Sequence, residues 1–228
     1  MSLELVCPAG TPAALRDLLQ KDPAKLHGFM ELDEPNFTFR NTPCNFLSGT
    51  KALAEEAVRE IGQCYVWRAR MAFNGSDEPC NLLTRLQQQA VVYDYVNSIS
   101  NVEDFVKAAL DLWEVRAPFG TYNITNPGII TGGELVEALQ RVVKSLRVKL
   151  SPPDEDPARY GSPAPQSNCV LDVAKLLKTG VRIRPVADAL KDSLERMRST
   201  ARPNRVPDSP SPRPHLPGAA HPPPSEVS

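Results

Sequence analysis

Lys51 is the side chain whose type and position most readily offer chemistry, because it follows a strong helix start. Ser48 is a favourable N-cap residue, and apolar residues such as Leu53 and Ala57 recur after it at helical spacing. Lys51 is therefore expected on the first turn of a helix. Its ammonium group would favour the charged form of a neighbouring acid and lower the pKa of that acid. The alternative is a solvated lysine on an ordinary helix.

Two arginines and an asparagine are further candidate binding groups. Residues 64–71 form a short run rich in β-forming residues, which predicts a strand. Arg68 and Arg70 would then project to the same face, where they could reach phosphates or stand as solvated charges. Asn81 lies at the start of a predicted helix at residues 79–86, where it could contact a ligand or act as the N-cap.

The elements that must position these groups alternate between strands and helices, which favours an α/β arrangement over a helical bundle. Residues 91–96 and 120–124 are predicted strands. Helices are predicted at 11–19, 102–113, 132–146, 172–180 and 185–197. Capping boxes at residues 100–103 and 131–134 precede the second and third of these helices. The helix at 102–113 is expected to bury one apolar stripe, made of Val102, Phe105, Val106, Ala109, Leu110 and Trp113.

Bulk properties exclude several classes of protein. The 228 residues are 41% hydrophobic, enough for one domain with a core, and the net charge of −1 gives no nucleic-acid footprint. Five cysteines without a Cys-x-x-Cys pair predict reduced thiols in the cytoplasm and no metal site. No apolar run approaches the roughly 18 residues that span a bilayer, and the start of the chain lacks the basic region of a signal peptide.

Four segments, taken in order, resemble the extended short-chain dehydrogenase/reductases, the NAD(P)-dependent nucleotide-sugar epimerases, dehydratases and reductases. They read Ser-Gly-Thr-Lys-Ala at 48–52, Arg-Ala-Arg-Met at 68–71, Tyr-Asn-Ile-Thr-Asn-Pro-Gly at 122–128 and Ser-Asn-Cys-Val-Leu-Asp at 167–172. The branch that contains the dTDP-4-dehydrorhamnose reductases is the most similar, and the resemblance extends from about residue 27 to 197.

The resemblance implies roles for particular residues. Lys51 matches the catalytic lysine of the family's Tyr-x-x-x-Lys motif, which holds the cofactor ribose, whereas Leu47 stands at the tyrosine position. Arg70 and Met71 match the strand end that leads onto the nicotinamide of NADP or NAD. Asn81 and Asn168 match positions near the sugar nucleotide.

The implied fold is a truncated Rossmann-like α/β fold, the second half of an extended short-chain dehydrogenase. No Gly-x-Gly-x-x-Gly follows a predicted strand in these 228 residues, so no phosphate-binding loop for a dinucleotide is predicted. We expect an N-terminal segment of uncertain structure at 1–30, the epimerase/reductase-like part at 31–200 and a disordered Pro-rich tail at 201–228.

Two functions follow as expectations. The first is a nucleotide-sugar reductase or epimerase of the dTDP-4-dehydrorhamnose reductase type, impaired alone because the Gly-rich loop and the tyrosine are missing. The second is a non-catalytic remnant that binds a sugar nucleotide or a protein partner. A chain cut within its sheet would leave an unpaired strand edge, so a homo-oligomer or a partner chain over that edge is expected. No nucleic-acid or membrane partner is expected.

Overall fold

The computed structural model describes residues 28–35, 38–40, 44, 46–156 and 168–200. The helix predicted at 11–19, most of the segment assigned to 1–30, and the Pro-rich tail from 201 lie outside these residues. No helix among those described is long and apolar enough to cross a membrane.

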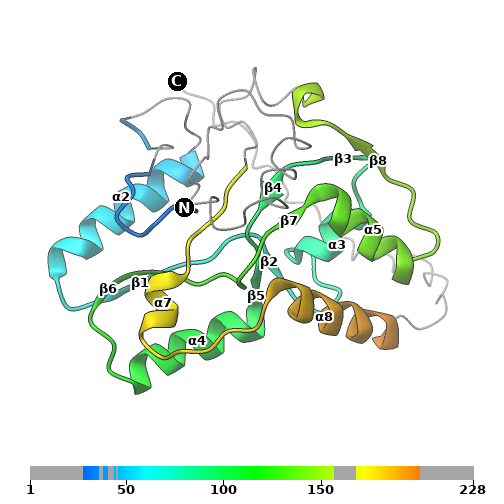
Figure 1. Ribbon diagram of the computed structural model, residues 1–228. Helices are drawn as coiled ribbons and strands as arrows, with labels where there is room; N and C mark the ends of the chain where they lie inside the picture. Colours follow the sequence, from blue (N-terminus) through cyan, green and yellow to red (C-terminus); the bar gives the residue numbers. More distant parts are fainter. Residues whose placement is uncertain (1–27, 36–37, 41–43, 45, 157–167, 201–228) are drawn as a thin grey trace, which may run out of the picture.

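A short parallel sheet with helices on both faces forms one part of the molecule. Strand β1 (Tyr65–Arg68) pairs in parallel with β6 (Gly120–Asn123). Helix α2 (Phe46–Ile61) covers one face, and α4 (Val102–Glu114) with the short helix α7 (Ala174–Lys178) covers the other (Figure 1). This is the α/β layering expected from the alternation of elements in the sequence.

Three further strand pairs carry the rest of the described chain. β2 (Ala72–Phe73) runs parallel to β5 (Ser100–Asn101), and β3 (Val91–Tyr93) runs parallel to β8 (Lys149–Ser151). β4 (Val96–Asn97) pairs antiparallel with β7 (Ile130–Thr131). The predicted strand at 91–96 is therefore two strands, separated by a bend at Asp94 and Tyr95.

Helices α3 (Leu82–Gln87), α5 (Gly132–Val142) and α8 (Val186–Thr200) gather around the larger apolar core. The helices predicted at 132–146 and from 185 to 197 are found, although α5 ends four residues early, and their apolar residues Leu135, Leu139, Leu190 and Leu194 are buried. A short 3-10 helix, η2 (Pro153–Glu155), follows β8. A smaller core lies between α4, β6 and α7.

Helix capping was predicted correctly at α5 and wrongly at two other helices. Thr131 and Glu134 form the complete capping box at α5. At α4 the N-cap is Asn101, whose side chain accepts from the Asp104 N–H, so the box expected at 100–103 is absent. At α2 the helix begins at Phe46, because the helical pattern extends upstream of the expected cap.

The core stripe predicted for α4 is correct at Phe105 and Ala109 and wrong at its other four members. The residues that α4 buries fully are Ala108, Ala109 and Leu112, which lie toward one side of the predicted stripe. The exposed members of that stripe are Val102 at 38%, Val106 at 50%, Leu110 at 57% and Trp113 at 65% exposure. The apolar surface of α4 is therefore wider than the surface that β1 and β6 cover.

Candidate functional site

The start of α2 differs from its expected geometry. Ser48 lies within the helix and is buried, so it is not the N-cap, and Lys51 falls on the second turn. Lys51 is exposed, and no hydrogen-bond partner meets its ammonium group among the residues that the structure describes. Leu47 is 62% exposed beside it. Within the described chain, no hydrogen bond or ion pair therefore joins Lys51 to an acidic side chain.

The face that α2 buries is small and polar. Its buried residues are Ser48, Gly49, Ala52 and Glu55, whereas its large apolar side chains, such as Leu53 at 55% exposure, point outward. Gly49 lies close to the ring of Phe39, where an added Cβ would come within 3.0 Å of ring atoms. Helical spacing predicted the helix correctly but did not indicate which side of it is covered.

A buried ion pair joins α2 to the sheet. Arg68 Nη2 donates to Glu55 Oε1 at 2.6 Å, and Arg68 Nε donates to Glu55 Oε2 at 3.2 Å. The side chain of Arg68 is 2% exposed and that of Glu55 is 7% exposed. Arg68 was expected to contact a phosphate or to be a solvated charge. In the structure it forms a buried ion pair with Glu55 instead. Such a pair costs several kcal/mol to break from one side, because the remaining charge stays buried.

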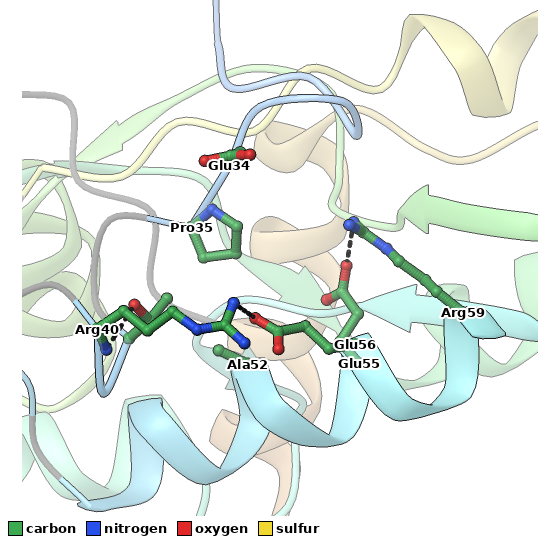
Figure 2. Close-up of a pocket in the computed structure, with 8 residues that line it drawn as sticks. Glu34, Pro35, Arg40, Ala52, Glu55, Glu56 and Arg59 are labelled. Carbon is green, nitrogen blue, oxygen red and sulfur yellow. Dashed lines mark hydrogen bonds and ion pairs between the residues drawn. The ribbon is translucent and has the colours of Figure 1, made fainter.

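A charged cavity of about 290 Å³ lies between α2 and the loop at 34–40. Figure 2 shows Glu34 and Pro35 on the loop side, and two ion pairs along the helix side, Arg40 with Glu56 at 3.0 Å and Arg59 with Glu55 at 2.5 Å. Because both cations that line it are already paired with carboxylates, this cavity offers an anionic ligand little free positive charge.

Arg70 and Asn168 converge on β4. Arg70 Nη2 donates to the side-chain oxygen of Asn97 at 3.0 Å, and the Val96 N–H donates to the side-chain oxygen of Asn168 at 2.8 Å. Arg70 Nε is buried and has no hydrogen-bond partner among the described residues. The structure thus brings two predicted site residues, distant in sequence, to consecutive residues of one strand.

Met71 follows Arg70 in a strained backbone conformation. Its φ of 43° lies in the left-handed region, which residues other than glycine rarely adopt. Such strain costs on the order of 1–3 kcal/mol and concentrates at functional sites. The conformation places Met71 on the wall of a second cavity.

This second cavity, the Met71 cavity, has a volume of about 350 Å³, within the range of roughly 300–1,000 Å³ typical of small-molecule sites. Its lining comes from the segment after β1, from α3 and β3, and from the start of α5: Met71, Ala72, Cys80, Leu82, Arg85, Leu86, Gln89, Ala90, Val91, Val92, Tyr93, Tyr95, Gly132 and Leu135. Apolar and aromatic walls with one exposed cation suit a ligand that carries a flat ring and a phosphate.

Sequence reasoning missed Arg85, Tyr93 and Gly132 in this cavity. Gly132 stands where an added Cβ would come within 3.0 Å of the carbonyl of Tyr93, so the wall there is built from two backbones in contact. The signal for Gly132 was its place after the capping residue Thr131. No sequence signal pointed to Arg85, because an exposed arginine on a helix is common.

Asn81 is the buried N-cap of α3, one of its two expected roles. Its side-chain oxygen accepts from the Leu83 N–H at 3.1 Å, and its amide group donates to the Asn74 carbonyl at 3.0 Å and to Ser76. Its residue neighbours Cys80 and Leu82 line the Met71 cavity. The side chain is thus engaged in shaping the turn before α3, and its contact with a substrate stays a prediction.

Tyr122 is a tyrosine of strand β6, yet it is not poised to transfer protons. Burial, then the neighbouring Tyr65 and the Glu31 carboxylate, raise the pKa of its phenol above the ordinary 10.0. Its hydroxyl donates to the Pro118 carbonyl at 2.7 Å. A proton donor near neutral pH needs a lowered pKa. Tyr122 therefore does not replace the tyrosine that is absent at position 47.

The residues present do not fit a nicotinamide dinucleotide. The sequence has no Gly-rich turn after a strand to receive its pyrophosphate. Lys51 could hold a ribose hydroxyl, but the neighbouring Leu47 has no hydrogen-bonding group. Among the described residues, no group of three or more His, Cys, Asp or Glu side chains could hold a metal ion.

The chain is similar in sequence to curated plant enzymes named for reactions of dTDP-4-dehydrorhamnose and of UDP-sugars. The chain is 30% identical over 150 residues to the bifunctional dTDP-4-dehydrorhamnose 3,5-epimerase/dTDP-4-dehydrorhamnose reductase of Arabidopsis thaliana, with 65% of this chain and 48% of that protein covered. It is 29% identical over 164 residues to a trifunctional UDP-glucose 4,6-dehydratase/UDP-4-keto-6-deoxy-D-glucose 3,5-epimerase/UDP-4-keto-L-rhamnose-reductase of the same plant, with 72% of this chain and 24% of that protein covered. The chain thus spans half or less of these curated relatives. No protein-family model matches it.

Solved structures show the same fold. The L780 UDP-rhamnose synthase of Acanthamoeba polyphaga mimivirus superposes with a TM-score of 0.65 at 19% identity, covering 82% of this chain and 69% of the synthase. The dTDP-4-dehydrorhamnose reductase of Bacillus anthracis in complex with NADP gives a TM-score of 0.54 at 17% identity, covering 75% and 58%. MoeE5 in complex with UDP-glucose and NAD gives 0.56 at 15% identity, covering 75% and 60%. The expected Rossmann-like α/β class is confirmed for the part of those folds that this chain covers.

Proposed function

We propose that this chain, a partial homologue of rhamnose-forming reductases and epimerases, is a nucleotide-sugar reductase/epimerase-like protein that keeps the sugar-nucleotide side of the site. The Met71 cavity is the observation that carries the proposal. It adjoins the Arg70–Asn97 contact and has the size and lining of a nucleotide pocket. MoeE5, whose fold is similar, was solved with UDP-glucose.

Each part of the cavity has a role in this proposal. The apolar walls, with Tyr93, hold the flat base, and Arg85, exposed on α3, meets the diphosphate through charge-assisted hydrogen bonds. Arg70 and Met71 follow the carboxyl end of β1 and connect it to the cavity. Ligands of α/β sheets bind at the carboxyl ends of the strands. Asn168 positions β4 through the Val96 N–H, and Asn81 positions α3.

NADP or NAD is the cofactor implied by the relatives, and it would supply or accept the hydride in their reactions. We propose that this chain alone does not bind it productively, because the Gly-rich turn and the tyrosine at position 47 are both missing. Lys51 would contact the cofactor ribose only where a dinucleotide-binding half lies beside it. A chain that binds a sugar nucleotide without turnover is therefore the second candidate function, favoured by Leu47.

Calorimetric titration of the purified chain with UDP-glucose and with dTDP-glucose tests the binding proposal. Saturable binding is expected, and Arg85→Gln should weaken it about tenfold, the effect of losing about 1.4 kcal/mol of charge-assisted hydrogen bonding. Arg198→Gln is the matched control, because Arg198 is an exposed arginine on α8 outside this cavity. Absence of binding by a folded wild-type chain, or equal loss in both variants, contradicts the proposal.

A second experiment concerns catalysis at position 47. NADPH oxidation is followed with a dTDP-4-keto sugar, for the wild type and for Leu47→Tyr, each with and without a separately expressed dinucleotide-binding half of a relative. We expect no turnover from the chain alone, and a gain of about 10²–10⁴-fold from the tyrosine only when the other half is present. Turnover by the wild-type chain alone would show that the cofactor site is complete after all.

Two broader expectations belong to the same proposal. A second copy or partner chain covers the edge of β1 that pairs with no described strand, and the protein works in the cytoplasm, where its five cysteines stay reduced.

A further inference from the structure

We propose that Asp94 is a positioning residue of the Met71 cavity, because its carboxylate holds one wall of that cavity against the start of α5. Asp94 is not among the residues that line the cavity, whereas its neighbours Tyr93 and Tyr95 both are. The role of Asp94 rests on the proposed binding of a sugar nucleotide in this cavity, and it adds a residue that governs affinity without touching the ligand. The contact of Asp94 with α5 can also be measured without any ligand.

Asp94 is the centre of a tight turn between β3 and β4. The Tyr95 N–H donates to the Tyr93 carbonyl at 2.8 Å, and a hydrogen bond between residues two apart closes a γ-turn of three residues. The Asp94 N–H donates to the Ser151 carbonyl of β8 at 2.9 Å. The γ-turn thus redirects the chain from β3 to β4 at the point where both tyrosines line the cavity.

Helix α5 binds this γ-turn through the first two N–H groups of the helix. The Gly132 N–H donates to the Tyr95 carbonyl at 3.1 Å, and the Gly133 N–H donates to Asp94 Oδ1 at 2.8 Å. The N–H groups at a helix start have no partner within the helix, and the positive end of the helix dipole favours a carboxylate there. Helix α5 also packs against β3 (Figure 1). The cavity wall and the start of α5 are therefore joined directly.

The Asp94 contact is the one between the γ-turn and α5 that a substitution can remove, because it is made by a side chain. The Gly132 contact is made by backbone groups, and an added Cβ there would come within 2.4 Å of the Tyr93 carbonyl. The Tyr95 hydroxyl donates to Asp156 Oδ2 at 3.0 Å, and both of these side chains are buried. The hydroxyl end of Tyr95 is therefore fixed separately, whereas the backbone of the γ-turn depends on α5.

A wall that is already ordered favours binding, because ordering it at the moment of binding costs free energy. Without the Asp94 carboxylate, the Gly133 N–H loses this acceptor and the γ-turn loses its side-chain contact with α5. The apolar side chains that anchor α5 in the larger core, Leu135 and Leu139, are unaffected. Affinity should therefore fall while the fold persists.

Three variants separate positioning from stability. Asp94→Ala removes the acceptor of the Gly133 N–H, and Asp94→Asn keeps an oxygen that can accept it. Thr131→Ala is the matched control, because it removes the neighbouring acceptor in the same helix turn, that of the Glu134 N–H. Titration calorimetry with UDP-glucose should give a dissociation constant about tenfold higher for D94A, the effect of one lost hydrogen bond, and values close to the wild type for D94N and T131A. Circular dichroism melting verifies that each variant folds, and Asp94→Leu replaces D94A if D94A does not.

Hydrogen exchange of the Tyr95 N–H reports on the γ-turn without any ligand. Its rate, divided by that of the Leu139 N–H within α5, should rise about tenfold in D94A and stay unchanged in D94N and T131A. Equal rises in D94A and T131A overturn the role of Asp94, and so does an affinity for UDP-glucose that D94A leaves unchanged or that D94N lowers as much as D94A. A wild type that binds no UDP-glucose but shows the expected exchange contradicts the sugar-nucleotide proposal and supports Asp94 as the residue that holds the γ-turn.

Discussion

Leu47 stands where the family that the sequence resembles has a tyrosine, so the proposed loss of catalysis depends on one side chain. The lysine four residues later is present and exposed, but a leucine neither donates a proton nor accepts a hydrogen bond. Tyr122 cannot substitute, because its pKa is raised and its hydroxyl is already donated to Pro118. At this scale we propose that the chain keeps groups that bind a sugar nucleotide, whereas position 47 carries no group that transfers a proton.

An acid-sensitive contact is expected at Asp192. Arg184 donates to its carboxylate at 3.1 Å, and this hydrogen bond, with the nearby Arg196, lowers the pKa of Asp192 below the ordinary 3.8. A lowered pKa in the folded state contributes stability above pH 3.8, and that stability is lost as the pH falls through the folded pKa. The wild-type melting temperature should therefore fall more steeply than that of Asp192→Asn as the pH falls below 3.8. Parallel curves for the two proteins would refute this assignment.

The extent to which the elements could be predicted depends on what lies against them. Periodicity and capping residues placed the starts of α5 and α8 correctly, and both helices bury apolar residues. The same reasoning found α2 and α4 but assigned the wrong sides to the core. An apolar stripe shows that a face avoids water, and it does not show which layer covers that face. In α2 the sheet is met by Ala52 and Glu55 instead.

The candidate site was predictable only in part. Arg70, Met71 and Asn168 came from motif resemblance, and the structure brings them to β4 and the Met71 cavity. Arg85 and Tyr93 could not be found, because they meet only when β3 and α3 pack against the start of α5. Such long-range packing leaves no local pattern in the sequence.

Two glycines near helix starts should differ in their tolerance of a methyl group. In Gly132→Ala the new Cβ meets the backbone carbonyl of Tyr93, a residue of β3 that is held by pairing with β8. A loss of about 1–3 kcal/mol in unfolding free energy is therefore expected. In Gly49→Ala it meets the ring of Phe39, which is 53% exposed and can turn away. Because alanine also favours helix by about 1 kcal/mol, that variant should be close to neutral. Urea denaturation measures both, and an equal loss in the two would count against this explanation.

The capping box of α5 gives another element-scale prediction. Thr131→Ala removes the side-chain oxygen that accepts from the Glu134 N–H at 3.2 Å. It should lower the unfolding free energy by about 1 kcal/mol, read as a shift in the urea midpoint with an unchanged slope. Thr50→Ala is the control, because the Thr50 hydroxyl donates to carbonyls within α2 and caps nothing. A larger loss for Thr50→Ala would contradict the capping role.

At the scale of the molecule, the candidate site belongs to the larger of two main apolar cores of the described chain. The larger is built by α3, α5 and α8, and the smaller by α4, β6 and α7. The Met71 cavity is walled by residues of the larger core, such as Leu82 and Leu135. A ligand in that cavity should therefore stabilise the whole fold and not only a loop.

Ligand binding should accordingly be visible as global stabilisation. At a concentration of UDP-glucose 100 times its dissociation constant, the gain is about 2.7 kcal/mol, or about 5–10 °C in melting temperature for a domain of this size. Scanning calorimetry measures it, with glucose alone as the control for a non-specific effect of the sugar. Equal shifts with glucose and UDP-glucose would exclude the nucleotide as the recognised group.

The pairing of the strands also dictates when this protein can fold during its synthesis. Each of the four strand pairs joins partners that are not neighbours in the sequence, β1 with β6, β2 with β5, β3 with β8 and β4 with β7. A chain emerging from the ribosome therefore holds β1 to β4 unpaired, and β3 waits until Ser151 has left the exit tunnel. Contacts between distant residues slow folding into the millisecond-to-second range, and the unpaired strands are open to aggregation in that interval. We therefore expect the nascent chain to need chaperones most before β8 is made.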